Sequence, residues 1–154
     1  MSTSVTSTAL DETDRVILSE LIRNGRATFK ELGVLAGLSP HAVAPRVRRL
    51  RDAGIVTGFT ALVDYGHVGR GLDALIDVRL LSTAKPETFE AAAGELPSIR
   101  EVSFVTGRFD YQLRAACVDA DDLDHTVRAL RTAGAAVTET RIVLRTKPFL
   151  RPVR

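Results

Sequence analysis

The stretch from Thr28 to Gly54 constrains this chain more than any other part of the sequence. Thr28 is followed three residues later by Glu31, the spacing at which each side chain satisfies a free backbone N–H at the start of a helix. A glycine at position 37 then ends this helix, and Ser39-Pro40 begins another, because serine caps a helix and proline suits its first position. The sequence therefore predicts two short helices joined by a tight turn, the arrangement of a helix-turn-helix.

The second of these helices, expected from Pro40 to Ala53, is strongly basic. No acidic residue lies between Leu38 and Arg51, and the four arginines of this stretch are Arg46, Arg48, Arg49 and Arg51. Such a block is typical of a helix that binds DNA phosphates, although a merely solvated helix face can have the same composition. The net charge of the whole chain is only +2 and does not indicate nucleic-acid binding by itself.

Apolar residues at helical spacing, Val43, Val47 and Leu50, are expected to form the inward face of this helix. The residues expected to contact DNA are Ser39, His41, Ala42, Pro45, Arg46, Arg48, Arg49 and Arg51. We expect His41 and Arg46 to approach base edges, while the other three arginines mainly hold phosphates. In the alternative interpretation, one or two of the four arginines only solvate the helix.

Pro45 conflicts with a regular helix at this place. A proline in a helix interior lacks the backbone donor and crowds the carbonyl four residues earlier, at a cost of about 3 kcal/mol. Either the helix kinks after its first turn, which the strong start at Ser39-Pro40 favours, or the helix proper begins near Pro45 after a separate turn. Pro45 also keeps open an alternative function, a small-molecule sensor or interaction module with weak or lost DNA binding.

The rest of the chain predicts a helix over 10–22, a strand over 55–63 and then a second domain. From residue 72 onward the expected strands are 72–81, 99–106, 111–118 and 137–146, and the expected helices are 85–96 and 121–132. This β-α-β-β-α-β order is the ferredoxin-like arrangement, with both helices on one face of a four-stranded antiparallel sheet. Because an apolar sheet face cannot stay wet, we expect a second copy of the chain to cover the other face, which makes a homodimer.

The composition offers little support for an enzyme or a membrane protein. The single cysteine, Cys117, cannot form an intrachain disulfide and is expected to be a buried apolar residue. The three histidines are scattered, and no nucleophile elbow or phosphate loop is present, so we expect no enzymatic activity, no metal and no cofactor. No apolar run approaches the roughly 20 residues of a membrane span, and the N-terminus lacks signal-peptide features. We therefore expect a cytoplasmic protein without a membrane partner.

Taken in order, the motifs resemble those of the Lrp/AsnC (feast/famine) family of transcriptional regulators. The resemblance is carried by LD-x-x-D-x-x-IL from Leu10, GLS from Gly37, RVRRL from Arg46, GRFDY from Gly107 and TRIVL from Thr140. It covers almost the whole chain beyond a disordered N-terminus at residues 1–9. It implies an α+β fold: a winged-type helix-turn-helix DNA-binding domain at 10–54, a hinge strand and linker at 55–70, and a ferredoxin-like, ligand-sensing domain at 71–154.

The resemblance also implies a sequence-specific regulator that binds pseudo-palindromic double-stranded DNA as a homodimer or an octamer. Its effector, commonly an amino acid or a related small metabolite, would sit between dimers near the GRFDY turn. By position the effector site would contain Gly107, Arg108, Phe109, Asp110, Tyr111, Thr140 and Arg141. Asp110 would accept from an ammonium group, and backbone N–H groups or an arginine would bind the carboxylate. In the alternative interpretation the same turn is only a tight hairpin in which Gly107 permits a positive φ and Asp110 bonds its own backbone, and the same residues could serve both roles.

Overall fold

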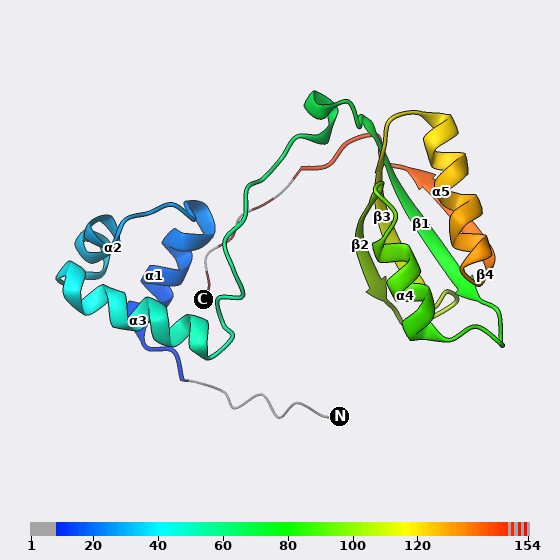
Figure 1. Cartoon of the computed structure of the whole chain (residues 1–154). Coiled ribbons are helices and arrows are strands. Elements are labelled where there is room, and N and C mark those ends of the chain that lie inside the picture. The colour runs from blue at the N-terminus through cyan, green and yellow to red at the C-terminus, as the bar shows by residue number, and fades with distance from the viewer. Residues whose placement is uncertain (1–8, 148, 150, 152, 154) are drawn as a thin grey trace. The chain divides into compact units, whose positions relative to one another are not determined.

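The computed structural model describes residues 9–147, 149, 151 and 153, so the disorder expected for residues 1–9 lies outside the described range except at residue 9. The chain divides into two compact units, which are drawn together in Figure 1. The second unit runs from Val63 to Thr146. Of the described residues, the first unit contains 9–62 and also 147, 149, 151 and 153.

The first unit is built from three helices whose starts are fixed by their caps. They are α1 Glu12–Arg23, α2 Phe29–Ala36 and α3 Pro40–Asp52. Asp11 caps α1, and its Oδ1 accepts from the backbone N–H of Asp14 at 2.7 Å. Thr28 and Glu31 form the predicted capping box of α2, and the backbone N–H of Thr28 holds the pKa of Glu31 below its usual value. Ser39 caps α3, as predicted.

The turn between α2 and α3 is closed by its backbone. Gly37 ends α2 in the left-handed region, with φ +66°, as its position in the turn predicted. The backbone N–H of Leu38 donates to the carbonyl of Gly33 at 2.9 Å, the bond that closes a helix of this kind. The approach is so close that a Cβ on Gly33 would lie 2.5 Å from the carbonyl oxygen of Leu38. Only glycine therefore fits at position 33 without moving the turn.

The core of the first unit contains the inward face that the sequence predicted for α3. Val43, Val47 and Leu50 are buried against the other two helices. The helices contribute Ile17, Leu18 and Leu32 to this core. α3 runs without interruption through Pro45, so the interpretation in which the helix begins near Pro45 is wrong. Pro45 lies on the exposed side of α3, where the carbonyl of His41 lacks its usual helical donor.

No strand is formed between α3 and the second unit, in a stretch that is described throughout. Residues 55–63, predicted as a hinge strand next to a winged-type domain, form bends and an extended segment instead. A strand requires hydrogen-bonding partners on a neighbouring strand, and the single chain offers none here. After this segment the chain forms a 3-10 helix, Tyr65–Val68, which Asp64 caps through the backbone N–H of Gly66.

The second unit has the predicted β-α-β-β-α-β order and forms a four-stranded antiparallel sheet in the order β2-β3-β1-β4. Its elements are β1 Leu72–Leu80, α4 Pro86–Gly94, β2 Ile99–Phe104, β3 Tyr111–Cys117, α5 Ala120–Thr132 and β4 Ala135–Ile142. Both helices pack on the same face of the sheet, as Figure 1 shows. Phe89 of α4 and Leu130 of α5 meet Ile76, Val78 and Leu113 of the strands in this core. Cys117 is buried as predicted, and burial raises the pKa of its thiol.

The opposite face of the sheet is charged, which corrects the expectation of an apolar face. Arg114 binds Asp73 through two bonds, with Nε–Oδ1 at 3.1 Å and Nη2–Oδ2 at 2.6 Å. Asp77 accepts from the amide of Gln112 at 2.9 Å and from the guanidinium of Arg141. Because alternate residues of a strand point to opposite faces, the helix-facing positions are apolar while these positions carry charge pairs. The need to cover an apolar face is therefore not a valid reason to expect a dimer.

Candidate nucleic-acid interface and effector site

The exposed side of α3 is the candidate DNA-binding face. With about 3.6 residues per turn, His41, Pro45 and Arg48 lie opposite the buried residues of this helix, and all three are exposed. Arg51 is exposed on one flank. Within the described part of the chain, neither Arg48 nor Arg51 forms an ion pair. These two guanidiniums are therefore available to an anion that approaches α3.

Arg46 and Arg49 lie on the other flank of α3, beside α1. The Nη1 of Arg46 lies 2.6 Å from Oδ2 of Asp11 and 2.9 Å from Oδ1 of Asp14. Arg49 forms an ion pair with the second oxygen of Asp14. The structure thus brings two of the four predicted DNA-binding arginines together with carboxylates of α1. It does not place Arg46 beside His41 on the outward side.

The electrostatics of this cluster follow from its geometry. The hydrogen bond from Arg46 holds the pKa of Asp11 below its usual value, and the same bond raises the pKa of Arg46. Asp14 is fully buried, which is rare for a carboxylate unless its charge is compensated. The sequence patterns did not reveal these contacts of Asp11 and Asp14 with α3. The signal in the sequence that could have indicated these ion pairs was the presence of acidic residues at the start of one helix and of a basic block in another. No local spacing, however, connects positions 14 and 49.

The first turn of α3 carries the remaining predicted DNA contacts. The hydroxyl of Ser39 accepts from the backbone N–H of Ala42 at 3.3 Å, so Ser39 already serves as the helix cap. Ala42 is half-buried, whereas His41 is exposed. Of the first-turn residues that were predicted to contact DNA, His41 presents the most accessible side chain with hydrogen-bonding groups.

The predicted effector turn is a hairpin tied to the end of β1. Gly107 has φ +118°, a conformation that favours glycine. The Oδ2 of Asp110 accepts from the backbone N–H of Leu80 at 2.8 Å, and the backbone N–H of Asp110 donates to Val78 at 2.9 Å. The carboxylate of Asp110 therefore bonds to the backbone of β1, and not to the backbone of its own hairpin as the alternative interpretation predicted. This bond uses only one carboxylate oxygen, so Asp110 can hold the hairpin and still accept from the ammonium group of an effector.

The other predicted effector residues are dispersed. Tyr111 is buried between the rings of Phe89 and Phe104, at centroid distances of 5.1 and 5.2 Å. Its hydroxyl donates to Glu90 at 2.7 Å, and burial raises the pKa of Tyr111 to about 12. Tyr111 is thus a core residue of this chain.

On β4, Thr140 and Arg141 point to opposite faces of the sheet. Thr140 pairs with Ile76 on the helix-covered side, and Arg141 reaches Asp77 on the charged face. Arg108 approaches Glu139 of the same strand at 3.7 Å. Of the predicted effector residues, those of the hairpin at 107–110 thus remain as the candidate site in the single chain, whereas Tyr111 lies in the core and Thr140 and Arg141 point to opposite faces of the sheet.

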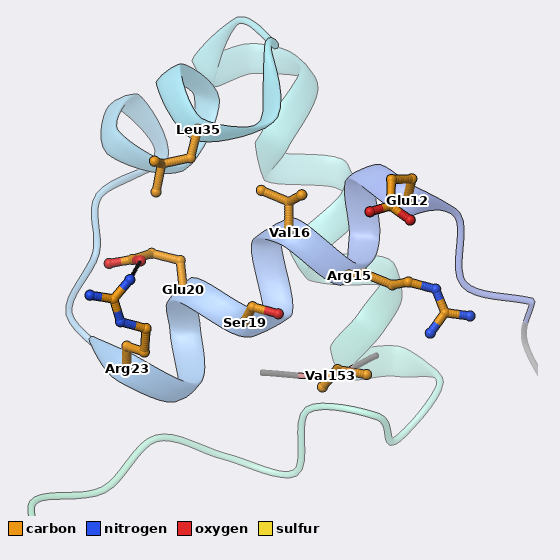
Figure 2. A pocket seen from close by; sticks show the side chains of 8 residues that line it. All are labelled: Glu12, Arg15, Val16, Ser19, Glu20, Arg23, Leu35 and Val153. Carbon is orange, nitrogen blue, oxygen red and sulfur yellow. Dashed lines mark ion pairs between the residues drawn. The ribbon is translucent and has the colours of Figure 1, made fainter. Parts of the chain in front are cut away.

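A pocket on the first unit contains none of the predicted site residues. It is lined by Glu12, Arg15, Val16, Ser19, Glu20, Arg23, Leu35 and Val153. Figure 2 shows that most of these side chains project from α1, with Leu35 contributed by α2. The ion pair drawn there joins Arg23 to Glu20 at 3.6 Å. The mixture of opposite charges and short apolar side chains does not converge on one ligand group.

Metal-ligating side chains do not cluster in the described part of the chain. No group of three or more His, Cys, Asp or Glu residues there is arranged to hold a metal ion. None of the described helices is both long enough and apolar enough to cross a membrane.

A capped helix-turn-helix with a basic second helix, followed by a ferredoxin-like domain, defines a class of two-domain DNA-binding proteins. Family models agree with this description. The AsnC-type helix-turn-helix domain matches residues 10–51, and the Lrp/AsnC ligand binding domain matches residues 73–150. The chain belongs to the Lrp/AsnC family of transcriptional regulators, which confirms the resemblance seen in its motifs. These regulators are not enzymes, as the sequence led us to expect.

Individual relatives cover nearly the whole chain. The transcriptional regulator LrpA of Mycobacterium tuberculosis is 34% identical, over 90% of this chain and 92% of its own length. A Neisseria meningitidis transcriptional regulator, solved in complex with L-methionine, has a TM-score of 0.85 and 33% identity, over 95% of this chain and 97% of that one. A feast or famine regulatory protein of M. tuberculosis, also complexed with L-methionine, has a TM-score of 0.84 and 34% identity, over 90% and 94%.

Proposed function

We propose that this transcriptional regulator binds a pseudo-palindromic DNA site as a homodimer or a higher assembly, and that an amino acid or related metabolite modulates the binding. The observation that carries the DNA part is the two-sided build of α3. One side is locked into the core through Val43, Val47 and Leu50, and the opposite side is exposed and basic. A helix presented in this way fits the major groove of B-DNA.

Within this proposal the roles along α3 divide by position. Ser39, His41, Ala42 and Pro45 lie at the N-terminal end, which in this motif approaches base edges. Arg48 and Arg51 hold phosphates and thereby set affinity and register. Family membership favours this function over a module that has lost DNA binding, and the unbroken course of α3 through Pro45 removes one reason for that alternative.

The proposed homodimer rests on membership of the family. A two-fold partner would place the same surface of each copy against itself. The two recognition helices would then read half-sites about 10 bp apart, or a multiple of that spacing. We place the protein in the cytoplasm, because that is where its DNA is read.

Fluorescence anisotropy tests the DNA part. The full chain is titrated with DNA from upstream of its own gene and with unrelated DNA of equal length, at several salt concentrations. We expect affinities that differ by about 10³-fold or more at physiological salt, and His41→Ala should reduce this ratio more than it changes the salt dependence. Equal affinity for both DNAs at every salt concentration would contradict sequence-specific binding at this site.

The effector part rests on the hairpin of residues 107–110 and on the two similar structures that contain L-methionine. Asp110 uses Oδ2 to bind the backbone N–H of Leu80, so its other oxygen is the proposed acceptor for an ammonium group. Calorimetric titration of the full chain with each of the twenty amino acids, L-methionine first, tests this assignment. Asp110→Asn should weaken any binding, with Asp124→Asn on α5 as the matched control. Silence across the panel with folded protein would rule out a simple amino-acid effector.

A further inference from the structure

We propose that Asp14 is a positioning residue that withholds Arg46 and Arg49 from DNA phosphates and leaves phosphate binding by α3 to Arg48 and Arg51. This inference rests on the proposed DNA-binding function. It divides the basic block of α3 into two pairs with different tasks. One pair fixes α3 against α1, and the other pair binds the DNA backbone.

The burial of Asp14 is the first observation. Its side chain is 0% exposed, and each of its two oxygens meets a different arginine of α3. A buried carboxylate remains charged in a folded protein when it is paired and hydrogen-bonded. Asp14 therefore requires both guanidiniums, and each guanidinium that left for a phosphate would leave it undercompensated.

The charge balance is the second observation. Asp11 adds a second carboxylate, bound to Arg46 at 2.6 Å, so that the cluster contains two positive and two negative side chains. Such a cluster has no net charge at neutral pH and adds little to the attraction of α3 for phosphates. Arg48 and Arg51 carry their charge without an ion pair among the described residues.

The cluster also joins two helices that are far apart in the sequence. Asp14 lies 32 residues before Arg46 and 35 before Arg49, so these contacts fix how α3 lies on α1. The angle of α3 decides which side chains reach base edges. Asp14 is thus expected to influence sequence discrimination without touching DNA.

The test compares single arginine variants of the full chain on DNA of one length and random sequence. The slope of log Kobs against log salt counts the phosphates that the protein neutralises, at about 0.9 for each phosphate. Arg48→Gln and Arg51→Gln should each flatten the slope by about this amount for every phosphate that is no longer neutralised. Arg46→Gln and Arg49→Gln, with the same change of charge on the same helix, should leave the slope unchanged. A loss of slope in Arg49→Gln equal to that in Arg48→Gln would overturn the proposal.

Asp14→Asn provides the opposite perturbation. Once the carboxylate is neutral, Arg46 and Arg49 become free to bind phosphates, so the slope should steepen and random-sequence DNA should bind more tightly. The ratio of specific to random-sequence affinity should fall at the same time. A residue that only stabilised the fold would give weaker binding to every DNA, which is the outcome that contradicts a positioning role.

Two matched variants complete the design. Glu12→Gln makes the same charge change on the same turn of α1, and Figure 2 shows Glu12 beside the pocket that α1 lines. It should leave the slope unchanged. Asp11→Asn, on an exposed partner of Arg46, should steepen the slope by less than Asp14→Asn. If Asp14→Asn does not fold, the arginine variants decide the question alone.

Failure of this inference differs from failure of the proposed function. If the unmodified protein shows no preference for any DNA and no dependence on salt, the DNA-binding function itself is wrong. If the unmodified protein binds with a steep slope that all four arginine variants reduce equally, DNA binding stands and only the division of the arginines is wrong.

Discussion

Replacing Gly33 with alanine should destabilise the helix-turn-helix, although alanine is the better helix former. Gly33 is buried within α2, where a Cβ would lie 2.5 Å from the carbonyl oxygen of Leu38. Because real Cβ atoms keep at least 3.0 Å from such a neighbour, the turn would have to open by about 0.5 Å. The obstacle is backbone and cannot rotate away. That movement would also strain the hydrogen bond that closes the turn, which the backbone N–H of Leu38 donates to the carbonyl of Gly33 at 2.9 Å.

The magnitude follows from three contributions. Alanine in place of glycine favours a helix by about 1 kcal/mol. Overpacking a tight site costs about 1–3 kcal/mol, and weakening the closing hydrogen bond costs about 1 kcal/mol more. The costs exceed the gain, so we expect the free energy of unfolding of the first unit to fall by about 1–3 kcal/mol.

Hydrogen exchange measured by mass spectrometry is the suitable assay, because a single melting curve would mix the two units. Peptides from α2 and α3 should lose protection in Gly33→Ala, while peptides from the sheet should not. Gly94→Ala is the matched control, because Gly94 ends α4 and a Cβ there would meet no other part of the protein within 4 Å beyond its own helix backbone and chain neighbours. It should be neutral or slightly stabilising. If α2 in Gly33→Ala is protected as well as in the unmodified chain, the steric reasoning is wrong.

Three further changes test other contacts. Arg46 lowers the pKa of Asp11 in the folded chain. The stability that Asp11 contributes is therefore present above its unfolded pKa and is lost as the pH falls. Asp11→Asn removes this contribution, so stability of the first unit should fall less steeply below about pH 4. The raised pKa of Tyr111 stabilises the fold below the unfolded pKa, and this stability is lost between about pH 10 and about pH 12. Tyr111→Phe should remove that loss. At neutral pH it should cost about 1 kcal/mol, because the bond to Glu90 is missing. Ser39→Ala should cost about 1 kcal/mol by uncapping α3.

Each of these changes has a direct measurement. Circular dichroism during acid titration checks Asp11→Asn, and an unchanged titration curve would contradict the ion pair as a source of stability. Denaturant unfolding at increasing alkaline pH checks Tyr111→Phe. If the variant and the unmodified chain lose stability in parallel over this pH range, the prediction for Tyr111 is wrong. Hydrogen exchange in α3 checks Ser39→Ala, where undiminished protection would mean that Ser39 contributes nothing as a cap.

Much of the fold was predictable because it depends on neighbours in the sequence. The capping box at Thr28 and the left-handed Gly37 were both predicted and both confirmed. The inward face of α3 followed from helical spacing, and the order of strands and helices followed from the alternation of their patterns. The one predicted strand that is missing, at 55–63, had a suitable local pattern but no neighbouring strand to pair with.

The sites were less predictable than the fold. The basic block of α3 marked the DNA-binding helix, but its composition did not distinguish Arg46 from Arg48. Likewise, the GRFDY motif located the hairpin of the second unit but did not show that Tyr111 would be buried in the core. Side chains of the same type at adjacent positions of one element point in different directions, and what they meet depends on other elements.

The sequence by itself determined most of the elements of this protein, their order and the family to which the chain belongs, because caps, turns and periodicities act over a few residues. Only the tertiary structure decided which charges meet. It placed Asp14 against Arg46 and Arg49, across 32 and 35 residues, and it paired Asp73 with Arg114 on the uncovered face of the sheet. These contacts depend on how packed elements lie on one another, and that placement is set by the shape of the whole core, which no local pattern encodes.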